Sequence, residues 1–376
     1  MRIMHVINTL ATGGAEMMLL KLLSATDGNW DPVVVSLADE GTIGPRILAL
    51  GIPVYSLGLR RGVPSPFRAL SIIPFVRRFR PQLIQGWMPH GNFMASLAGV
   101  SSQNRAPVLW NIRMSVYDIA KEHLLTAAAI RLGAFLSRHP AAIVYNSQIG
   151  ARQHEALGYH PAKRIVIPNG FDCQMFRPDD YARRQVRAEL GVGNDTILVG
   201  LVARYHCLKD HAGFLRAAGL VVQAHPAVHF VLVGKGMSRE ESTLMKLISE
   251  QLLQDRISLL GERYDIPPLT AALDIACSAS TGEGFSNAIG EAMACGVPCV
   301  VTDVGDSTYI VGDTGLSVPP RDPETLAQAI SRLIDAGVTR RRQLGAAARR
   351  RIESEFSLPA IVRRYEDLYE KHLSLI

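Results

Sequence analysis

The sequence contains no long apolar run free of charge. Within its 376 residues, no stretch offers the roughly 18 or more consecutive apolar residues that a membrane-spanning helix needs. The opening apolar segment, residues 1–7, is too short for a signal peptide and predicts a buried first strand. We therefore expect a cytoplasmic protein.

Cysteines and common cofactor motifs are also scarce. The five cysteines form an odd number without a Cys-x-x-Cys pair, so neither a disulfide framework nor a zinc site is favoured. No Asp-x-Asp sequence is present to hold a divalent metal, and Asp303 and Asp306 have the wrong spacing. The absence of Gly-x-Gly-x-x-Gly leaves a dinucleotide fingerprint unsupported. No repeat of about 20 to 50 residues and no low-complexity tract is found.

What is present is the composition of a globular protein. Hydrophobic residues make up 48% of the chain and charged residues 20%. This balance excludes a disordered chain. A chain of this length is too long for one ordinary core, so we expect two domains.

Positive charge is concentrated in the first half. Residues 1–172 carry 17 Lys and Arg against 9 Asp and Glu, a net of +8, whereas residues 173–376 carry 23 against 25, a net of −2. One basic amphipathic segment interleaves apolar side chains with arginines, namely Arg60, Arg61, Arg68, Arg77, Arg78 and Arg80.

Two explanations of this basic segment remain open. It can lie on an anionic membrane surface or face an anionic acceptor. Alternatively, Ile72, Ile73, Phe75 and Val76 pack into the domain while the arginines are solvated, which is the commoner use of such a pattern. Basic charge alone does not favour nucleic acid as a partner, because no recognition motif accompanies it.

Short apolar runs alternate with longer helical patterns along the whole chain. The runs lie at residues 32–37, 83–86, 142–145, 165–167, 197–202, 229–233 and 298–301. Because they are continuously apolar, they predict parallel strands buried on both faces and flanked by helices. The turn cluster at residues 168–172 predicts a domain boundary near residue 172. We expect an α/β protein of two doubly wound domains, with ligands bound in the cleft between them at the carboxyl ends of the strands.

Residues 280–298 carry the most informative motif. Glu283 and Glu291 lie eight residues apart around a glycine turn, which is a little over two helical turns. If a helix begins near Ser286, both carboxylates can face one ligand at the positive end of that helix. A phosphate or a sugar oxygen suits such a place. Ordinary helix capping is the alternative explanation of the same spacing.

Other loops follow predicted strands in the same way. Gly13 and Gly14 separate the first strand from a helical pattern and allow close approach of the backbone to a ligand. Arg204 and Lys209 follow the strand at 197–202 and can straddle a diphosphate. A surface ion pair of Lys209 with Asp210 is the alternative.

Glycines end two more strands of the second half. Gly234 and Gly236 follow the strand at 229–233, and Gly261 follows the next one. Each alone predicts only a turn. Together with residues 204–209 and 283–291, they place four loops at one edge of a single sheet.

This set of motifs, in this order, resembles the retaining glycosyltransferases of the GT-B fold, in the large group often called family 4 (group 1). The resemblance covers nearly the whole chain and rests on residues 13–16, residues 168–172, Arg204 with Lys209, residues 234–236 and the Glu-x7-Glu pair. It implies two Rossmann-like domains, with acceptor binding in residues 1–172 and donor binding in residues 173–355. It also implies a C-terminal helix, about residues 356–376, that packs back on the first domain.

The resemblance implies a role for each matching residue. Glu291 would bind the ribose hydroxyls of the nucleotide, and Glu283 would contact the donor sugar. Arg204 and Lys209 would neutralise the leaving diphosphate. The remaining donor-binding positions would act through their backbone and are Gly14, Gly234, Gly284, Phe285, Ser286 and Asn287.

His90 is a further candidate, because it follows the strand at 83–86 and could reach the transferred sugar from the first domain. A structural histidine is the alternative. The resemblance implies transfer without a metal or other cofactor, since the leaving phosphate is thought to assist deprotonation of the acceptor in such enzymes. Catalysis would then depend on positioning and charge stabilisation.

The implied function is that of a hexosyltransferase (EC 2.4) in surface polysaccharide biosynthesis of the bacterial type. The partners would be a nucleotide sugar donor and a glycan or lipid-linked oligosaccharide acceptor, with a peripheral location on the inner face of the plasma membrane as a candidate. A UDP-sugar 2-epimerase of the same architecture and a nucleotide-sugar-binding subunit without turnover are the alternatives.

Overall fold

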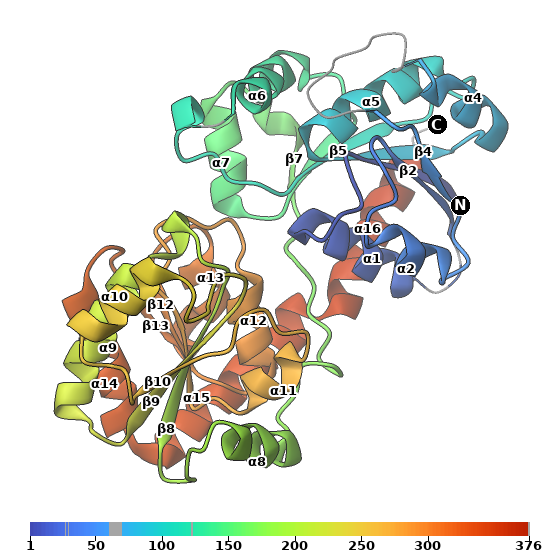
Figure 1. Ribbon diagram of the computed structural model, residues 1–376. Helices are drawn as coiled ribbons and strands as arrows, with labels where there is room; N and C mark the ends of the chain where they lie inside the picture. The colour runs from blue at the N-terminus through green and yellow to red at the C-terminus, as the bar shows by residue number, and fades with distance from the viewer. Residues whose placement is uncertain (27, 29, 60–69, 122, 375–376) are drawn as a thin grey trace. The chain divides into compact units, whose positions relative to one another are not determined.

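The computed structural model of the protein describes residues 1–26, 28, 30–59, 70–121 and 123–374 (Figure 1). The chain divides into two compact units. Unit 1 comprises Met1–Gly170 together with Leu358–Ile376, and unit 2 comprises Phe171–Ser357. The sequence placed the boundary at residue 172 and the return near residue 356, within two residues of this division.

Unit 1 contains a parallel sheet in the order β3-β2-β1-β4-β5-β6-β7. Its central strands are almost wholly buried, which is why their sequences are continuously apolar. The strands are β1 (Arg2–Ile7), β2 (Asp31–Ser36), β3 (Val54–Ser56), β4 (Leu83–Trp87), β5 (Val108–Ile112), β6 (Ala142–Tyr145) and β7 (Arg164–Val166). The predicted strands at 32–37, 83–86, 142–145 and 165–167 are confirmed to within a residue or two at each end.

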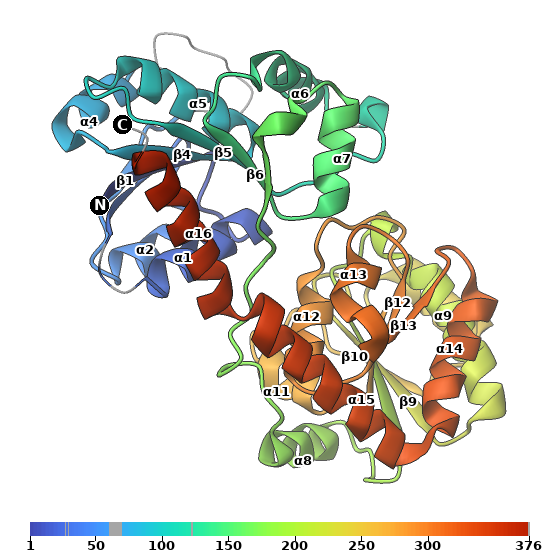
Figure 2. The same cartoon turned by 180° about the vertical axis from the view of Figure 1, so that it is seen from behind.

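Helices cover both faces of this sheet (Figures 1 and 2). One face carries α1 (Gly14–Ser24), α2 (Gly44–Leu48) and α16 (Leu358–Leu373). The other carries α4 (Ile72–Phe79), α5 (Met88–Ser101), α6 (Leu124–Leu136) and α7 (Gln148–Ala156). Helices on both faces of a parallel sheet define the doubly wound arrangement that the alternating pattern predicted.

The C-terminal helix α16 belongs to the core of unit 1. Ile361, Tyr365 and Tyr369 are fully buried in it. The Tyr369 hydroxyl donates a hydrogen bond to Oε1 of Gln85 on β4, and the Tyr365 hydroxyl accepts one from Nδ2 of Asn111 at 3.0 Å. Helix α16 therefore completes the helical layer over β4 and β5.

Unit 2 repeats the architecture with the sheet order β10-β9-β8-β11-β12-β13. The strands are β8 (Ile197–Val202), β9 (Val228–Val233), β10 (Ile257–Leu259), β11 (Ile275–Ser278), β12 (Cys299–Thr302) and β13 (Leu316–Val318). One face carries α9 (His211–Ala224), α10 (Ser242–Glu250) and α14 (Pro323–Asp335). The other carries α8 (Asp180–Glu189), α11 (Ile266–Ala271), α12 (Asn287–Ala294), α13 (Ser307–Val311) and α15 (Gly337–Arg351).

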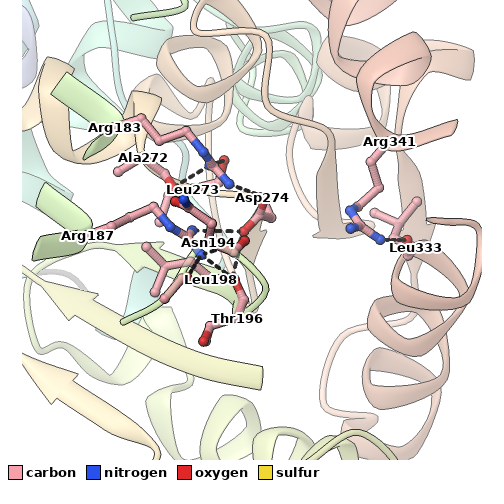
Figure 3. Close-up of polar contacts among 11 residues, drawn as sticks. Arg183, Arg187, Asn194, Thr196, Leu198, Ala272, Leu273, Asp274, Leu333 and Arg341 are labelled. Atoms are coloured by element: carbon pink, nitrogen blue, oxygen red, sulfur yellow. Dashed lines mark hydrogen bonds and ion pairs between the residues drawn. The ribbon is translucent and has the colours of Figure 1, made fainter. Parts of the chain in front are cut away.

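An arginine network closes the amino-terminal edge of the unit 2 sheet (Figure 3). The Asp274 carboxylate, just before β11, accepts hydrogen bonds from Arg183 at 2.7 Å, Arg187 at 3.2 Å and the Leu198 amide at 2.8 Å. Arg187 is only 2% exposed and also donates to the Gly193 carbonyl. These arginines of α8 hold the sheet at the end opposite to the predicted site.

The arginines at residues 340–342 and 349–351 of α15 are not all solvated. Three of them bind backbone carbonyls, because a guanidinium can satisfy the unpaired carbonyls at helix and loop ends. The carbonyl partners are Leu333 and Ile334 for Arg341 (Figure 3), Cys173, Phe176 and Ala294 for Arg349, and Tyr309 and Ile310 for Arg351.

The described part of the basic segment packs as an ordinary core helix. In α4, Ile72 and Val76 are buried, whereas Arg77, Arg78 and Arg80 are exposed. Arg60, Arg61 and Arg68 lie outside the described residues. Within the described ranges, no helix combines the length and apolar character that crossing a bilayer requires.

Candidate functional site

The strand order of unit 2 places a switch point between β8 and β11. The helix that follows β8, α9, lies on one face of the sheet, and α12, which follows β11, lies on the other. Where two adjacent strands send their chains to opposite faces, a crevice opens outside their carboxyl ends. Residues 203–210 and 279–286 are the loops on its two sides.

The loop after β8 is fixed by hydrogen bonds at both ends. A 3₁₀ turn over Cys207–Lys209 ends at Asp210, whose carboxylate accepts a hydrogen bond from the Gly213 amide at 3.0 Å and caps α9. The Thr281 amide donates to the Leu208 carbonyl at 2.8 Å and ties this loop to the one after β11. Lys209 is thereby held above the switch point.

Lys209 and Glu283 form an ion pair through Nζ and Oε1. The Ser280 hydroxyl donates to the same carboxylate oxygen at 2.7 Å. The Lys209 side chain is 25% exposed and that of Glu283 is 12% exposed, so the pair is partly shielded from water. The alternative pairing of Lys209 with Asp210 is not found, since the Asp210 carboxylate caps α9.

The helix predicted to begin near Ser286 is confirmed. Ser286 is the extended residue before α12, and its side chain makes no capping hydrogen bond. Glu291 follows in the second turn. Phe285 is buried and packs on Phe171 and Phe356, with ring centroids 6.1 and 5.6 Å away, which anchors the loop before the helix. The amides of the first turn point toward the switch point, as at any helix start.

Both glutamates line one small cavity beneath these loops. Its volume is about 30 Å³. Lys209 and Ser286 line it as well. The structure therefore brings Glu283, Glu291 and Lys209 together, and the cavity marks where their loops converge.

Gly234 and Arg204 occupy the neighbouring loops. Gly234 has φ of +143°, and a Cβ there would come within 2.2 Å of the Ala203 carbonyl oxygen. Packing alone therefore requires glycine at this position. Arg204 lies two residues beyond β8 with an exposed side chain, so its guanidinium is accessible at the same edge.

Gly14 and His90 belong to unit 1 and flank the switch point of that sheet, between β1 and β4. Gly14 is the exposed first residue of α1, and a Cβ added there would meet no atom within 4 Å. The fold itself does not need a glycine here. His90 lies exposed in the first turn of α5, where partial desolvation lowers its pKa, so the ring is neutral at pH 7.

Arg113 is a residue of this edge that the sequence analysis missed. It directly follows β5 and donates hydrogen bonds to the Tyr365 hydroxyl at 3.1 Å and to Oδ1 of Asn169. Its guanidinium carbon lies 5.8 Å from the centroid of the Trp87 ring. Among the residues that the structure describes, no carboxylate pairs with Arg113. A cation directly after a strand, the signal used for Arg204, would have found it.

His211 is a second residue that the sequence analysis missed. It opens α9 and is buried, and neither ring nitrogen has a hydrogen-bond partner within the described residues. Burial, with smaller contributions from Lys209 and His206, lowers its pKa to about 4. The ring is therefore neutral beside the Lys209 loop. Nothing in the sequence separates it from a surface histidine.

Two family models match the chain. The model described as "Glycosyl transferase 4-like domain" matches residues 13–170, and "Glycosyl transferases group 1" matches residues 196–336. A D-inositol 3-phosphate glycosyltransferase of Thermomonospora curvata is 33% identical over 60% of this chain and 56% of its own length. A UDP-Gal:alpha-D-GlcNAc-diphosphoundecaprenol alpha-1,3-galactosyltransferase of Escherichia coli is 28% identical over 56% of this chain and 54% of its own. The chain thus spans about half the length of these curated relatives.

Solved structures share the whole fold. The Anabaena protein Alr3699/HepE, solved in complex with UDP, aligns with a TM-score of 0.86 at 22% identity over 99% of this chain and 100% of its own. Its complex with UDP-glucose aligns with a TM-score of 0.81 at 23% identity, over 100% of each chain. With matching models for both halves and the two parallel sheets of the fold, the chain belongs to the group 1 glycosyltransferases and has the GT-B fold.

Proposed function

We propose that this protein is a retaining hexosyltransferase (EC 2.4) that moves a sugar from a nucleotide-diphosphate donor to a glycan or lipid-linked oligosaccharide acceptor. The Lys209–Glu283 pair above the unit 2 switch point carries the proposal, because it sets a cation beside a carboxylate at the edge where ligands bind in such sheets. The E. coli relative is named as a transferase that acts on a diphosphoundecaprenol-linked sugar. This name supports a lipid-linked acceptor and a surface polysaccharide pathway.

The donor is proposed to bind along the carboxyl edge of unit 2. Glu291, in the second turn of α12, binds the ribose hydroxyls, and Glu283 contacts the transferred sugar. Amides of residues 284–287 at the start of α12 hold sugar hydroxyls and the diphosphate. Arg204 and Lys209 neutralise the charge that grows on the diphosphate as the glycosidic bond breaks. The UDP and UDP-glucose bound by the Anabaena structures support a nucleotide sugar in this role.

Transfer is proposed to proceed without a metal ion or a side-chain nucleophile. Two cations from one loop can take over the charge stabilisation that a divalent metal supplies elsewhere. Retention then follows from attack of the acceptor on the face that the diphosphate leaves, with a phosphate oxygen taking the acceptor proton. The described residues hold no group of three or more His, Cys, Asp or Glu side chains suited to a metal.

The acceptor is proposed to bind at the carboxyl edge of unit 1. His90 is exposed beside β4, and its neutral ring can accept or donate a hydrogen bond to a sugar hydroxyl. Arg113 lies beside Trp87, the last residue of β4, and among the described residues its hydrogen-bond acceptors are neutral oxygens of Asn111, Tyr365 and Asn169. Such a guanidinium suits the phosphate of a lipid-linked acceptor.

A screen of thermal stability against UDP-, GDP- and ADP-sugars identifies the donor, since a ligand stabilises the fold by the logarithm of its saturation. With the best donor and a diphosphate-linked sugar acceptor, Glu291→Ala and Lys209→Ala should each remove most turnover. Unchanged turnover in both variants would contradict the proposed donor site. A product formed without acceptor would instead indicate the 2-epimerase, and donor binding without any product would indicate a binding subunit.

The protein is also proposed to work at the inner face of the plasma membrane, where a lipid-linked acceptor is found. The net charge of +8 on residues 1–172 supports this location, because the cytoplasmic leaflet is anionic.

A further inference from the structure

Helix α6 presents an apolar face that the described residues of unit 1 leave largely uncovered. Leu124, Leu132 and Phe135 are 84%, 51% and 71% exposed. They are spaced by eight and three residues, so they lie along one side of the helix, with Ala128 between them. An exposed apolar stripe of this kind marks an interaction surface. We call these four residues with Arg131 and Arg138 the α6 surface.

The opposite side of α6 shows that the helix is not simply apolar all round. Ala127, Ile130 and Gly133 are buried against the sheet, where Ile130 joins the core with Trp110 and Ile143. Packing of the helix therefore needs only this inner side. Most of the surface of Leu124 and Phe135, and about half of that of Leu132, lies outside this packing.

The described charged residues of the α6 surface itself are both basic. Arg131 and Arg138, the charged residues nearest to Phe135 in sequence, are both exposed. Residues 41–164 contain 15 Lys and Arg and three acids, Asp118, Glu122 and Glu155, and Glu155 is paired with Arg164 at 3.2 Å. Helix α4, on the same face of the sheet (Figures 1 and 2), adds exposed Arg77, Arg78 and Arg80.

We propose that the α6 surface docks unit 1 on an anionic lipid bilayer. Leucines and a phenylalanine on one side of a helix, flanked by arginines, are the pattern of a helix that lies in the membrane interface. The apolar side chains enter the acyl boundary, while the long arginine side chains keep their charges at the headgroups. Helix α4 mainly supplies charge, since Ile72 and Val76 are buried and Ile73, Phe75 and Phe79 are partly buried in the core. We therefore expect α6, and not the basic segment at residues 60–80, to insert its side chains into the membrane.

A second copy of the chain is a poorer occupant. In a symmetric contact, the same patch faces itself. Two copies joined through α6 would bring Arg131 and Arg138 of both together, and no acid of this helix could pair with them. An anionic bilayer pairs with all of these charges at once. Charge complementarity therefore selects lipid.

The inference rests on the proposed membrane location, but its test does not need catalysis. Sedimentation with vesicles of phosphatidylglycerol and phosphatidylcholine, without donor or acceptor, measures binding of the full chain. The wild type should bind these vesicles, bind phosphatidylcholine vesicles far more weakly, and be released by high salt. The double variant Leu132→Ser/Phe135→Ser should bind on the order of tenfold or more weakly.

Matched controls separate a specific surface from general loss of apolar area or charge. Tyr181→Ser removes another exposed aromatic side chain from a helix of unit 2 and should bind like the wild type. Arg131→Glu/Arg138→Glu should lose binding to anionic vesicles, whereas Arg342→Glu on α15 should not. If Leu132→Ser/Phe135→Ser does not fold, vesicle binding by Arg131→Glu/Arg138→Glu still tests the α6 surface.

Three results would overturn the inference. One is wild-type protein that does not bind anionic vesicles, and another is undiminished binding by both α6 variants. The third is a dimer in sedimentation velocity that Leu132→Ser/Phe135→Ser dissociates, which would assign the surface to a second copy. Turnover with a short, water-soluble acceptor is measured in parallel. Its absence alongside intact vesicle binding would count against the proposed function alone.

Discussion

Lys209 and Glu283, 74 residues apart in the sequence, form an ion pair across the unit 2 switch point. Lys209 is proposed to stabilise the diphosphate, and Glu283 is proposed to contact the transferred sugar. Because Oε1 of Glu283 accepts from both Lys209 and Ser280, the position of the cation and that of the carboxylate depend on each other.

Substitution of this pair should therefore be non-additive. Lys209→Ala and Glu283→Ala should each lower kcat by about 10² to 10³-fold, as the loss of one group that stabilises developing charge does. The double variant should be little worse than either single one, so a double-mutant cycle of kcat should give a coupling of about 2.7–4 kcal/mol, close to the whole loss of one single variant. Strictly additive losses would show that the two residues act independently.

Gly14→Ala separates ligand approach from packing. Since a Cβ at Gly14 meets no protein atom, the free energy of unfolding should change by less than about 0.5 kcal/mol. If the loop closes on the diphosphate, turnover should fall by about tenfold or more. Gly193→Ala is the matched control, because a Cβ there also meets nothing and the residue lies away from the site. Full activity of Gly14→Ala would leave this loop without a donor role.

Arg113→Gln tests the acceptor cation. The variant should raise KM for a phosphate-bearing acceptor by about tenfold or more while leaving the KM for the donor unchanged. Tyr365→Phe removes the 3.1 Å hydrogen bond to Arg113 but keeps the charge, so it controls for a purely structural role. Equal effects of the two variants on acceptor KM would assign Arg113 to anchoring α16.

His211 should make stability depend on pH. Its folded pKa, about 4, lies below the unfolded value near 6.5, so the unfolded state takes up the proton first as pH falls. Stability should be fully present above pH of about 6.5 and decline toward pH 4, by at most about 1.4 kcal/mol per unit from this group. Urea unfolding of wild type and His211→Phe at pH 7 and pH 5 measures the difference. Parallel losses in both proteins would contradict the assignment.

Arg187→Met should destabilise unit 2 without touching the predicted site. The substitution removes one of the donors to Asp274, which keeps Arg183, and leaves the Gly193 and Thr196 carbonyls without the Arg187 donor, so a loss of about 1–3 kcal/mol is expected. Arg184→Met on the exposed side of the same helix should change the unfolding free energy by less than about 0.5 kcal/mol. Urea denaturation compares the two. Similar stabilities would show that Arg183 alone satisfies Asp274.

Eight strands and the helix at Glu291 were predictable because each leaves a local signal; the strands are β1, β2, β4, β6, β7, β8, β9 and β12. No apolar run was predicted for β3, β5, β11 or β13. Continuous apolar runs mark strands buried on both faces, and the boundaries differ by a residue or two because hydrogen bonding, not hydropathy, ends a strand. Gly234 shows the limit of such signals. Its glycine suits ligand approach, yet the Ala203 carbonyl already requires it.

The arginines of α15 also show that a local sequence signal does not fix the role of a side chain. Arg340 to Arg342 look alike in the sequence, but only Arg341 is buried and bonded to the end of α14. Charge alone does not tell a solvated arginine from one that satisfies carbonyls, since both fit a helix. The carbonyls at the end of α14 determine which of these arginines is buried.

The sequence by itself determined two doubly wound α/β units and the loops that carry Arg204, Lys209, Glu283 and Glu291, because hydropathy and glycine turns are written locally along the chain. The tertiary structure decided which of these side chains meet. It paired Lys209 with Glu283, buried His211, set Arg113 beside Trp87 and left the outer side of α6 uncovered. Those outcomes depend on strand order and helix packing, which join residues that are distant in the sequence.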